Sequence, residues 1–154
     1  MKKGFTTIEF LIVVAIVGFL AAILMPVFTS SYDNLKIEGA YKQLMQDIRY
    51  AQQLAISHQV THGVSFDLNN EAYFVYRQNT SSIVKDPSTQ KKLSVSFAAG
   101  KFQGINLVGT TFVFPSDVLE FNAIGAPSSG GAITLNYNGI TKTVTIEANT
   151  GRVY

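Results

Sequence analysis

A chain of 154 residues is long enough for one globular unit with appendages but too short for two full domains. Charged residues make up only 14% and apolar residues 47%, which excludes a disordered chain, and the lack of cysteine excludes disulfides and thiolate sites. The formal net charge of +2 is too small to indicate a polyanion-binding protein through charge alone.

The first predicted element is an apolar helix over residues 10–28, nineteen residues without a charged or strongly polar side chain. At about 1.5 Å of rise per residue it is roughly 28 Å long, close to the roughly 30 Å apolar core of a bilayer. Lys2 and Lys3 precede it, and Asp33 is the first charged residue after it. The positive-inside rule therefore predicts a single membrane span with a cytoplasmic N-terminus and the remaining chain outside.

A cleavable secretory signal begins in the same way, with basic residues before an apolar stretch. Its apolar part usually has about 7 to 15 residues and ends at a small-x-small site. Here the run is longer, and Ala21-Ala22 lies inside it with further apolar residues following. These differences favour a retained anchor.

Three residues in or beside this run each allow two interpretations. Glu9 either needs a partner, since a charge deep in lipid costs on the order of 2.5 to 3.5 kcal/mol, or snorkels from the headgroup boundary at little cost. Pro26 either kinks the helix or marks the end of the span. Gly18 is either a close contact between helices or simply a small residue.

Residues 4–9, with the sequence GFTTIE, follow Lys2-Lys3 directly and lead into the apolar run. This arrangement resembles the type III signal of type IV prepilins and type II secretion pseudopilins. The resemblance implies that a prepilin peptidase cuts between Gly4 and Phe5 and N-methylates the new terminal residue, Phe5. Removing Lys2 and Lys3 would leave ten basic and ten acidic side chains, and thus no net charge.

The remainder of the family motif is matched in part. Glu9, Gly18 and the helix-bending Pro26 stand where members of the family have these residue types. The usual leucine at the third mature position is Thr7, and Phe10 follows Glu9 where an aliphatic residue is commoner. Neither departure affects the expected cleavage or the acidic residue.

The motif has a physical rationale in filament assembly. Cleavage creates a cationic α-amine on Phe5, about one helical turn from Glu9. In a helical bundle the carboxylate of one subunit can meet the amine of its neighbour, which favours assembly and sets the axial register. The implied partners are other pilin or pseudopilin subunits, the prepilin peptidase, an inner-membrane assembly platform and secreted substrate.

An amphipathic helix is predicted after the apolar run. Apolar residues recur at spacings of three and four, while charged residues mostly occupy the other faces. We expect one continuous helix from about Phe5 to about His58, whose second half is covered by a sheet. The apolar stripe consists of Ile37, Tyr41, Leu44, Ile48, Ala51 and Ala55.

From residue 60 the hydrophobic period changes to two, which indicates strands. The clearest hairpin is joined at Asn138-Gly139, a dipeptide suited to a type I′ turn. Residues 78–92 and 122–131 are polar or rich in small residues and are predicted to be exposed, mobile loops. The predicted strands are 60–68, 72–77, 93–97, 105–108, 111–114, 118–121, 132–137 and 140–148.

The predicted organisation is a leader over residues 1–4, an apolar helix over 5–28, an amphipathic helix over 29–59 and a β-rich head over 60–154. This α+β fold, a long N-terminal helix packed against an antiparallel β-rich head, is pilin-like. With its closing segment Gly151-Arg152-Val153, it is similar to the minor pseudopilin H (GspH) group and the FimT-like minor pilins. The resemblance implies an inner-membrane subunit that enters a pilus or pseudopilus.

Residues with potential chemistry favour no catalytic site. His58 and His62 have the spacing of one helix face, but no HExxH arrangement accompanies them, and the helix is expected to fray there. Asp67, Asn69 and Glu71 suit a β-turn better than a calcium loop. No nucleophile elbow, P-loop or GxGxxG is present, so neither an enzyme nor a cofactor or metal site is predicted.

A second interpretation keeps this architecture but gives the head a ligand, for instance DNA during uptake. The candidate residues are Lys85, Lys91, Lys92 and Lys101, which are predicted to lie in loops. Ser, Thr and Asp dilute these lysines, and they lack the interleaved aromatic residues expected of single-strand binders. The structural subunit is therefore the favoured hypothesis.

Overall fold

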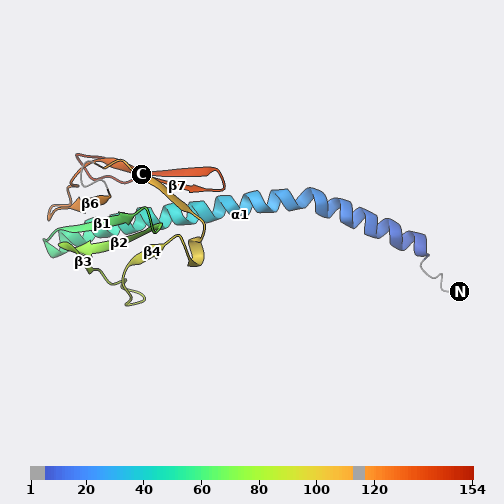
Figure 1. The fold of residues 1–154 in the computed structure, drawn as a ribbon, viewed down its shortest axis with the longest axis horizontal. Helices are drawn as coiled ribbons and strands as arrows, with labels where there is room; N and C mark the ends of the chain where they lie inside the picture. Colours follow the sequence, from blue (N-terminus) through green and yellow to red (C-terminus); the bar gives the residue numbers. More distant parts are fainter. Residues whose placement is uncertain (1–5, 113–116) are drawn as a thin grey trace. The chain divides into compact units, whose positions relative to one another are not determined.

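The computed structural model describes residues 6–112 and 117–154, apart from the side chains of residues 24–30. Within them the chain divides into two compact units, which we call the N-terminal segment (Met1–Leu35) and the head (Lys36–Tyr154). The elements appear in Figure 1 in chain order: α1 (Thr7–His58), β1 (His62–Asp67), β2 (Ala72–Arg77), β3 (Asn79–Ile83), β4 (Ser94–Ser96), η1 (Gly100–Phe102), β5 (Asn106–Thr110), β6 (Val118–Phe121), β7 (Gly131–Tyr137) and β8 (Ile140–Ile146).

The predicted long helix is confirmed as α1, which begins at Thr7 and ends at His58. In the head, its apolar stripe is fully buried at Ile37, Ala40, Leu44, Ile48, Ala51 and Ala55. Tyr41, which the sequence placed in this stripe, lies at its border and is only partly buried. Gln59 has a φ of 55° and ends the helix in the left-handed conformation.

The larger sheet of the head is antiparallel, with the strand order β3-β2-β1-β6. β2 pairs with β1 along its full length, while its opposite edge pairs with β4 near Tyr73 and with β3 near Tyr76. β6 follows β1 at the other edge, where Val64 stands opposite Leu119. Arg77 at the end of β2 therefore stands between His62 at the start of β1 and Asn79 at the start of β3.

The smaller sheet has the order β5-β7-β8 and contains the predicted C-terminal hairpin. Asn138 and Gly139 join its strands with φ angles of 49° and 83°, as a type I′ turn requires. Gly151 has a φ of 66° and turns the chain back, so that Val153 pairs with Ile146. The Arg49 guanidinium of α1 donates to the Val153 carbonyl at 2.7 Å and so ties the chain end to the helix.

One core joins α1 to both sheets, which confirms the expected α+β class. Each strand pair contributes inward-facing apolar side chains to the same cluster around the helix. Burial alternates from Val64 to Asp67 in β1 and in the middle of β7, which matches the period of two seen in the sequence. Representative members are Leu44, Phe66, Val75, Leu119, Leu135 and Val144.

Two predictions about the head were wrong in part. Residues 78–92 are mostly exposed, but they are not a loop throughout, since β3 occupies Asn79–Ile83 and residues 85 and 92 form a β-bridge. β5 ends at Thr110, and residues 111 and 112 are not in a strand, although the Thr111 amide still donates to Ala132. Residues 113 and 114 of that predicted strand lie outside the described residues.

Candidate functional site

The N-terminal end of α1 is closed by a reciprocal pair of hydrogen bonds between Thr6 and Glu9. The Glu9 carboxylate accepts from the Thr6 amide at 2.9 Å and from the Thr6 hydroxyl at 2.7 Å. In return the Glu9 amide donates to the Thr6 hydroxyl at 3.4 Å. This is a capping box, in which N-cap and N3 residues satisfy amides that the helix itself leaves unpaired.

The capping box was visible in the sequence but was not predicted. Thr6-x-x-Glu9 immediately before an apolar run is the sequence signature of this cap. Glu9 was predicted to be either a lone acid or a snorkelling one, whereas its carboxylate already has hydrogen-bond donors within its own chain. A role for Glu9 in assembly is therefore separate from its local role as a cap.

Other predicted N-terminal sites are located only in part. Gly4 and Phe5 lie outside the described residues, and so does the side chain of Pro26. An added Cβ at Gly18 would meet nothing within 4 Å, so the described chain itself does not require glycine there. Any requirement for a small residue at this position would come from another molecule.

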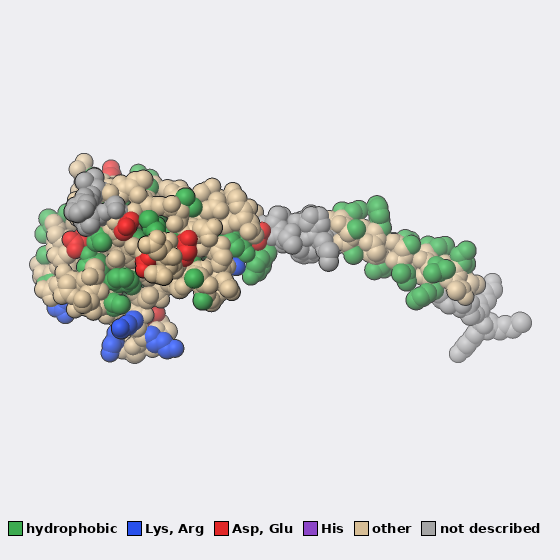
Figure 2. Space-filling model, viewed as in Figure 1, with side chains coloured by type: hydrophobic (Ala, Val, Ile, Leu, Met, Phe, Trp, Pro, Cys, Tyr) green, Lys and Arg blue, Asp and Glu red, His purple; other side chains and the backbone are tan. Residues whose placement is uncertain are grey.

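The N-terminal segment exposes its apolar side chains on all sides of the helix. Ile8, Phe10 and Phe19 are 67%, 63% and 68% exposed, and every large apolar side chain between them is at least half exposed. Figure 2 shows hydrophobic side chains along the visible face of this helix. So much contiguous apolar surface indicates that lipid or other subunits cover it.

Among the described residues, no helix combines the length and the hydropathy needed to cross a membrane.

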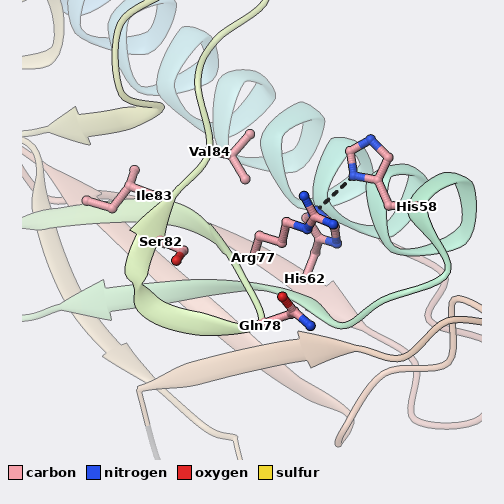
Figure 3. Close-up of a pocket in the computed structure, with 7 residues that line it drawn as sticks. All are labelled: His58, His62, Arg77, Gln78, Ser82, Ile83 and Val84. Carbon is pink, nitrogen blue, oxygen red and sulfur yellow. Dashed lines mark hydrogen bonds between the residues drawn. The ribbon is translucent and has the colours of Figure 1, made fainter.

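In the head, a cavity of about 510 Å³ lies where α1 ends, β1 begins and β2 turns into β3 (Figure 3). His58 is the last residue of α1 and His62 the first of β1, so the two do not share a helix face. They nevertheless meet across the turn. The lining residues are His58, His62, Arg77, Gln78, Ser82, Ile83 and Val84.

The two histidines form a directional hydrogen-bond chain. Nδ1 of His62 lies 3.0 Å from the Val60 carbonyl oxygen. Because a carbonyl oxygen can only accept a hydrogen bond, Nδ1 carries the proton of this ring. Its Nε2 then accepts from Nδ1 of His58 at 3.3 Å. Burial, and to a lesser extent the charges of His58 and Arg77, lower the pKa of His62, which keeps this ring neutral.

The suspected calcium loop is an ordinary turn, as predicted. Asp67 accepts from the amides of Asn69 and Asn70 at 3.1 and 3.0 Å, which uses its carboxylate to close the β1–β2 turn. The Glu71 carboxylate is engaged elsewhere and accepts from the Leu107 amide. Among the described residues, no group of three potential metal-ligating side chains is close enough to hold an ion.

Three of the candidate lysines lie on one hairpin that projects from the larger sheet. Lys85 stands directly opposite Lys92, and the Asp86 amide next to Lys85 donates to the Lys91 carbonyl at 2.8 Å. All three lysines are exposed, and Figure 2 shows basic side chains gathered on such a projection. Lys101, by contrast, lies on η1 with its ammonium 5.0 Å from the Phe102 ring centroid.

Asp47 is a buried carboxylate on the helix face that packs against β2. It is only 6% exposed, and it accepts from the Tyr73 hydroxyl at 2.7 Å and from the Gln43 amide at 3.0 and 3.1 Å. No described cationic side chain forms a salt bridge with it. Burial is the main cause that raises the pKa of Asp47, because the charged form loses water.

Comparisons with known proteins agree with this architecture. Residues 40–151 match the family model described as type II transport protein GspH. The competence protein ComGD of Bacillus subtilis (strain 168) is 26% identical over 152 residues, which cover 99% of this chain and 92% of ComGD.

Two solved structures share the fold. The minor pseudopilin EpsH from the type 2 secretion system of Vibrio cholerae superposes with a TM-score of 0.58 at 13% identity, over 76% of this chain and 93% of EpsH. The type IV minor pilin FimU of Pseudomonas aeruginosa (strain PAO1) gives 0.56 at 14% identity, over 79% of this chain and 89% of FimU.

The family model spans most of the head and includes the helix stripe from Ala40 onward, both sheets and the turn at Gly151. The chain therefore belongs to the GspH family of minor pseudopilins and pilins, whose members are structural subunits and not enzymes.

Proposed function

We propose that this protein is a prepilin-type subunit of a type II secretion pseudopilus or a type IV pilus, trimmed after Gly4 and assembled through its N-terminal helix. The exposed apolar surface between Ile8 and Ile23 carries the proposal, because such a surface needs cover from lipid or from other subunits. Family membership of the head supports it. The relative ComGD aligns over almost the whole chain, and its name indicates that a competence machine is a further setting to consider.

Before assembly, residues 10–28 would anchor the protein in the inner membrane. Lys2-Lys3 would remain in the cytoplasm, and the head would face the periplasm or cell exterior. This part of the proposal rests on the uninterrupted apolar sequence and its length. The inner-membrane assembly platform and the prepilin peptidase would meet the chain in this state.

During assembly, the Phe5 α-amine of one subunit would pair with the Glu9 carboxylate of another. In the described chain Glu9 accepts hydrogen bonds only from Thr6, which is uncharged, so its negative charge is not matched by a described cation. An ammonium group supplied by a neighbour would compensate that charge in an apolar filament core. Axial register would follow, because a displaced neighbour leaves the charge unmatched.

Intact-mass analysis of the protein purified from its host membranes tests the proposal. We expect a mass that lacks Met1–Gly4 and carries one additional methyl group, which fragmentation places on Phe5. Gly4→Val is the matched control and should retain the first four residues. A wild-type protein that keeps Met1–Gly4 would contradict the proposal and would indicate a membrane-tethered domain with another function.

The lysine hairpin favours a second candidate function, a head that binds a polyanion such as DNA. Lys85, Lys91 and Lys92 are held together by backbone pairing, and the nearby Asp86 carboxylate is occupied by Ser88. Clustered cations can bind phosphates even when the net charge of a chain is near zero.

A salt-dependent gel shift with the full chain in detergent tests this candidate. Replacing Lys85, Lys91 and Lys92 by alanine should abolish binding to duplex DNA. Replacing Lys42, Lys101 and Arg152 removes the same charge elsewhere on the head and should preserve it. Equal binding by both triple variants, or no salt-sensitive binding by the wild type, argues against the candidate.

A further inference from the structure

The cavity at the end of α1 is lined by hydrogen-bond donors. Its polar side chains are two imidazoles, one guanidinium, one amide and one hydroxyl, from His58, His62, Arg77, Gln78 and Ser82. None of the described residues that line it is acidic. A concave site with several donors and no carboxylate suits a negatively charged oxygen group.

Arg77 is the permanent cation of this cavity and has no hydrogen-bond or ion-pair partner among the described residues. It is exposed at the end of β2, and its guanidinium makes no hydrogen bond or salt bridge within the described chain. In Figure 3 its side chain extends to the His62 ring, and its charge helps to lower the pKa of that histidine. The guanidinium thus lies beside the imidazole without a compensating anion among the described residues, which disfavours a charge on His62.

The acid in the adjoining hollow is bound to another residue. Glu120 lines an adjoining hollow together with Gln78, but its carboxylate accepts from the Tyr76 hydroxyl at 2.6 Å. The charged and titratable groups that face His62 are therefore His58 from α1 and Arg77 from β2, both positive or neutral.

The hydrogen-bond chain leaves one imidazole nitrogen available. Nδ1 of His58 donates to Nε2 of His62, and Nδ1 of His62 donates to Val60. Nε2 of His58 has no partner within the described chain. When His58 is protonated, this nitrogen becomes a donor directed to a ligand, without breaking the bond to His62.

We propose that this cavity binds an oxyanion, a phosphate or a carboxylate group, held by Arg77, His58, Gln78 and Ser82. The anion would be the negatively charged partner that the guanidinium lacks among the described residues, and it would accept hydrogen bonds from the other donors. By linkage, a bound anion favours the form in which the imidazole pair carries one additional proton, on Nε2 of His58, so the anion binds more tightly as pH falls. The site belongs to the head alone and does not depend on how the N-terminal helix assembles.

A metal ion is the alternative ligand for the two histidines. The separation of 3.3 Å between Nδ1 of His58 and Nε2 of His62 is also what two nitrogen ligands about 2.0 to 2.1 Å from a tetrahedral ion have. The guanidinium of Arg77 opposes a cation, and the described residues supply no third ligand. These two observations favour the anion.

The test is an NMR titration of the full chain in a non-ionic detergent, with the imidazole signals of His58 and His62 as the readout. Sodium phosphate and sodium acetate are added in separate titrations at constant ionic strength, balanced with sodium chloride. We expect saturable shifts at roughly millimolar anion. Binding should be tighter at about pH 6 than at about pH 8, because histidine ordinarily changes its charge between these values. The anion with the lower dissociation constant shows whether the site prefers a phosphate or a carboxylate group.

Arg77→Gln should weaken anion binding at least about tenfold, because it removes a charge-assisted donor. Arg152→Gln removes the same charge from an exposed arginine outside the cavity and should leave binding unchanged. Backbone amide spectra verify that both variants are folded. The proposal is overturned if neither anion gives a saturable shift, if Arg77→Gln binds as the wild type does, if both variants weaken binding equally, or if zinc chloride alone produces saturation.

Discussion

The two units of this chain differ in the burial of their apolar side chains. In the head, Leu44 on α1 is fully buried against the sheets, whereas Leu20 in the N-terminal segment is 52% exposed. Both are leucines on the same helix, so burial is decided by what lies beside them. The head is complete within one chain, while the N-terminal segment has an apolar surface that only other molecules can cover.

The polar residues of the two units differ in the same sense. Glu9 makes only local hydrogen bonds to Thr6, within one turn of helix. Asp47 is linked to Tyr73 on another element, far away in sequence. The head thus uses polar groups to join distant segments, and the N-terminal segment uses its acid to close a helix end.

The largest expected effect concerns Glu9, where charge and capping can be separated. Glu9→Gln keeps the capping box, since glutamine also serves at this position, but it removes the charge. We expect normal insertion and a loss of most filament incorporation, measured as the fraction of protein in sheared filaments relative to membranes.

Thr6→Ala is the matched control, because it weakens the cap and retains the carboxylate. It should assemble at near wild-type levels. If Glu9→Gln assembles normally, or if Thr6→Ala fails as severely, the role of Glu9 lies in helix capping and not in pairing with a neighbour.

The second expected effect compares identical truncations in the two units. Leu44→Ala should lower the free energy of unfolding of the head by about 2 to 5 kcal/mol, because it leaves a cavity in a closed core. Leu20→Ala should leave that free energy unchanged. Urea denaturation of the full chain in detergent, followed by tyrosine fluorescence, measures both. A comparable loss from Leu20→Ala would mean that the N-terminal segment contributes to the stability of the head.

A third effect distinguishes the hydrogen bond of Asp47 from its charge. Asp47→Ala should destabilise the head by about 1 to 3 kcal/mol, because the buried Tyr73 hydroxyl loses its acceptor. Asp47→Asn keeps an acceptor and removes a poorly solvated charge, so at neutral pH it should be neutral or stabilising. Urea denaturation at neutral pH tests both variants, and equal losses would contradict the assignment.

The raised pKa of Asp47 also gives this residue a pH signature. The folded protein binds this proton more tightly than the unfolded chain does, so the contribution of Asp47 to stability decreases as pH rises from 3.8 through its folded pKa. Wild type and Asp47→Asn should therefore converge below 3.8 and differ above the folded pKa. A difference that does not change with pH would exclude this mechanism.

The smallest effect is expected for the surface salt bridge between α1 and β8. The Lys142 ammonium lies 2.8 Å from the Glu38 carboxylate, but the two side chains are 40% and 34% exposed to solvent. A double-mutant cycle of Glu38→Gln and Lys142→Met should give a weak coupling that high salt removes. A strong, salt-independent coupling would show that this pair helps to hold the helix on the sheet.

Local patterns in the sequence were sufficient for much of this protein. The spacing of Leu44, Ile48, Ala51 and Ala55 determined a half-buried helix, because residues three and four apart share one face. The Asn138-Gly139 turn and the strands on either side were predictable for the same reason, since they depend on neighbours in sequence. The Thr6 and Glu9 cap was equally local, and it could have been recognised from the signature alone.

Contacts between distant segments could be decided only by the tertiary structure. β3 has a polar, exposed sequence without strand periodicity, and it becomes a strand only because the edge of β2 offers it hydrogen bonds. The spacing of His58 and His62 suggested a shared helix face, but a helix end and a strand start bring them together instead. Arg77, at the end of another strand, completes their cavity and had no signal in the sequence. A sequence specifies local geometry through backbone sterics and hydrophobic period, whereas the pairing of remote edges depends on the whole packed core.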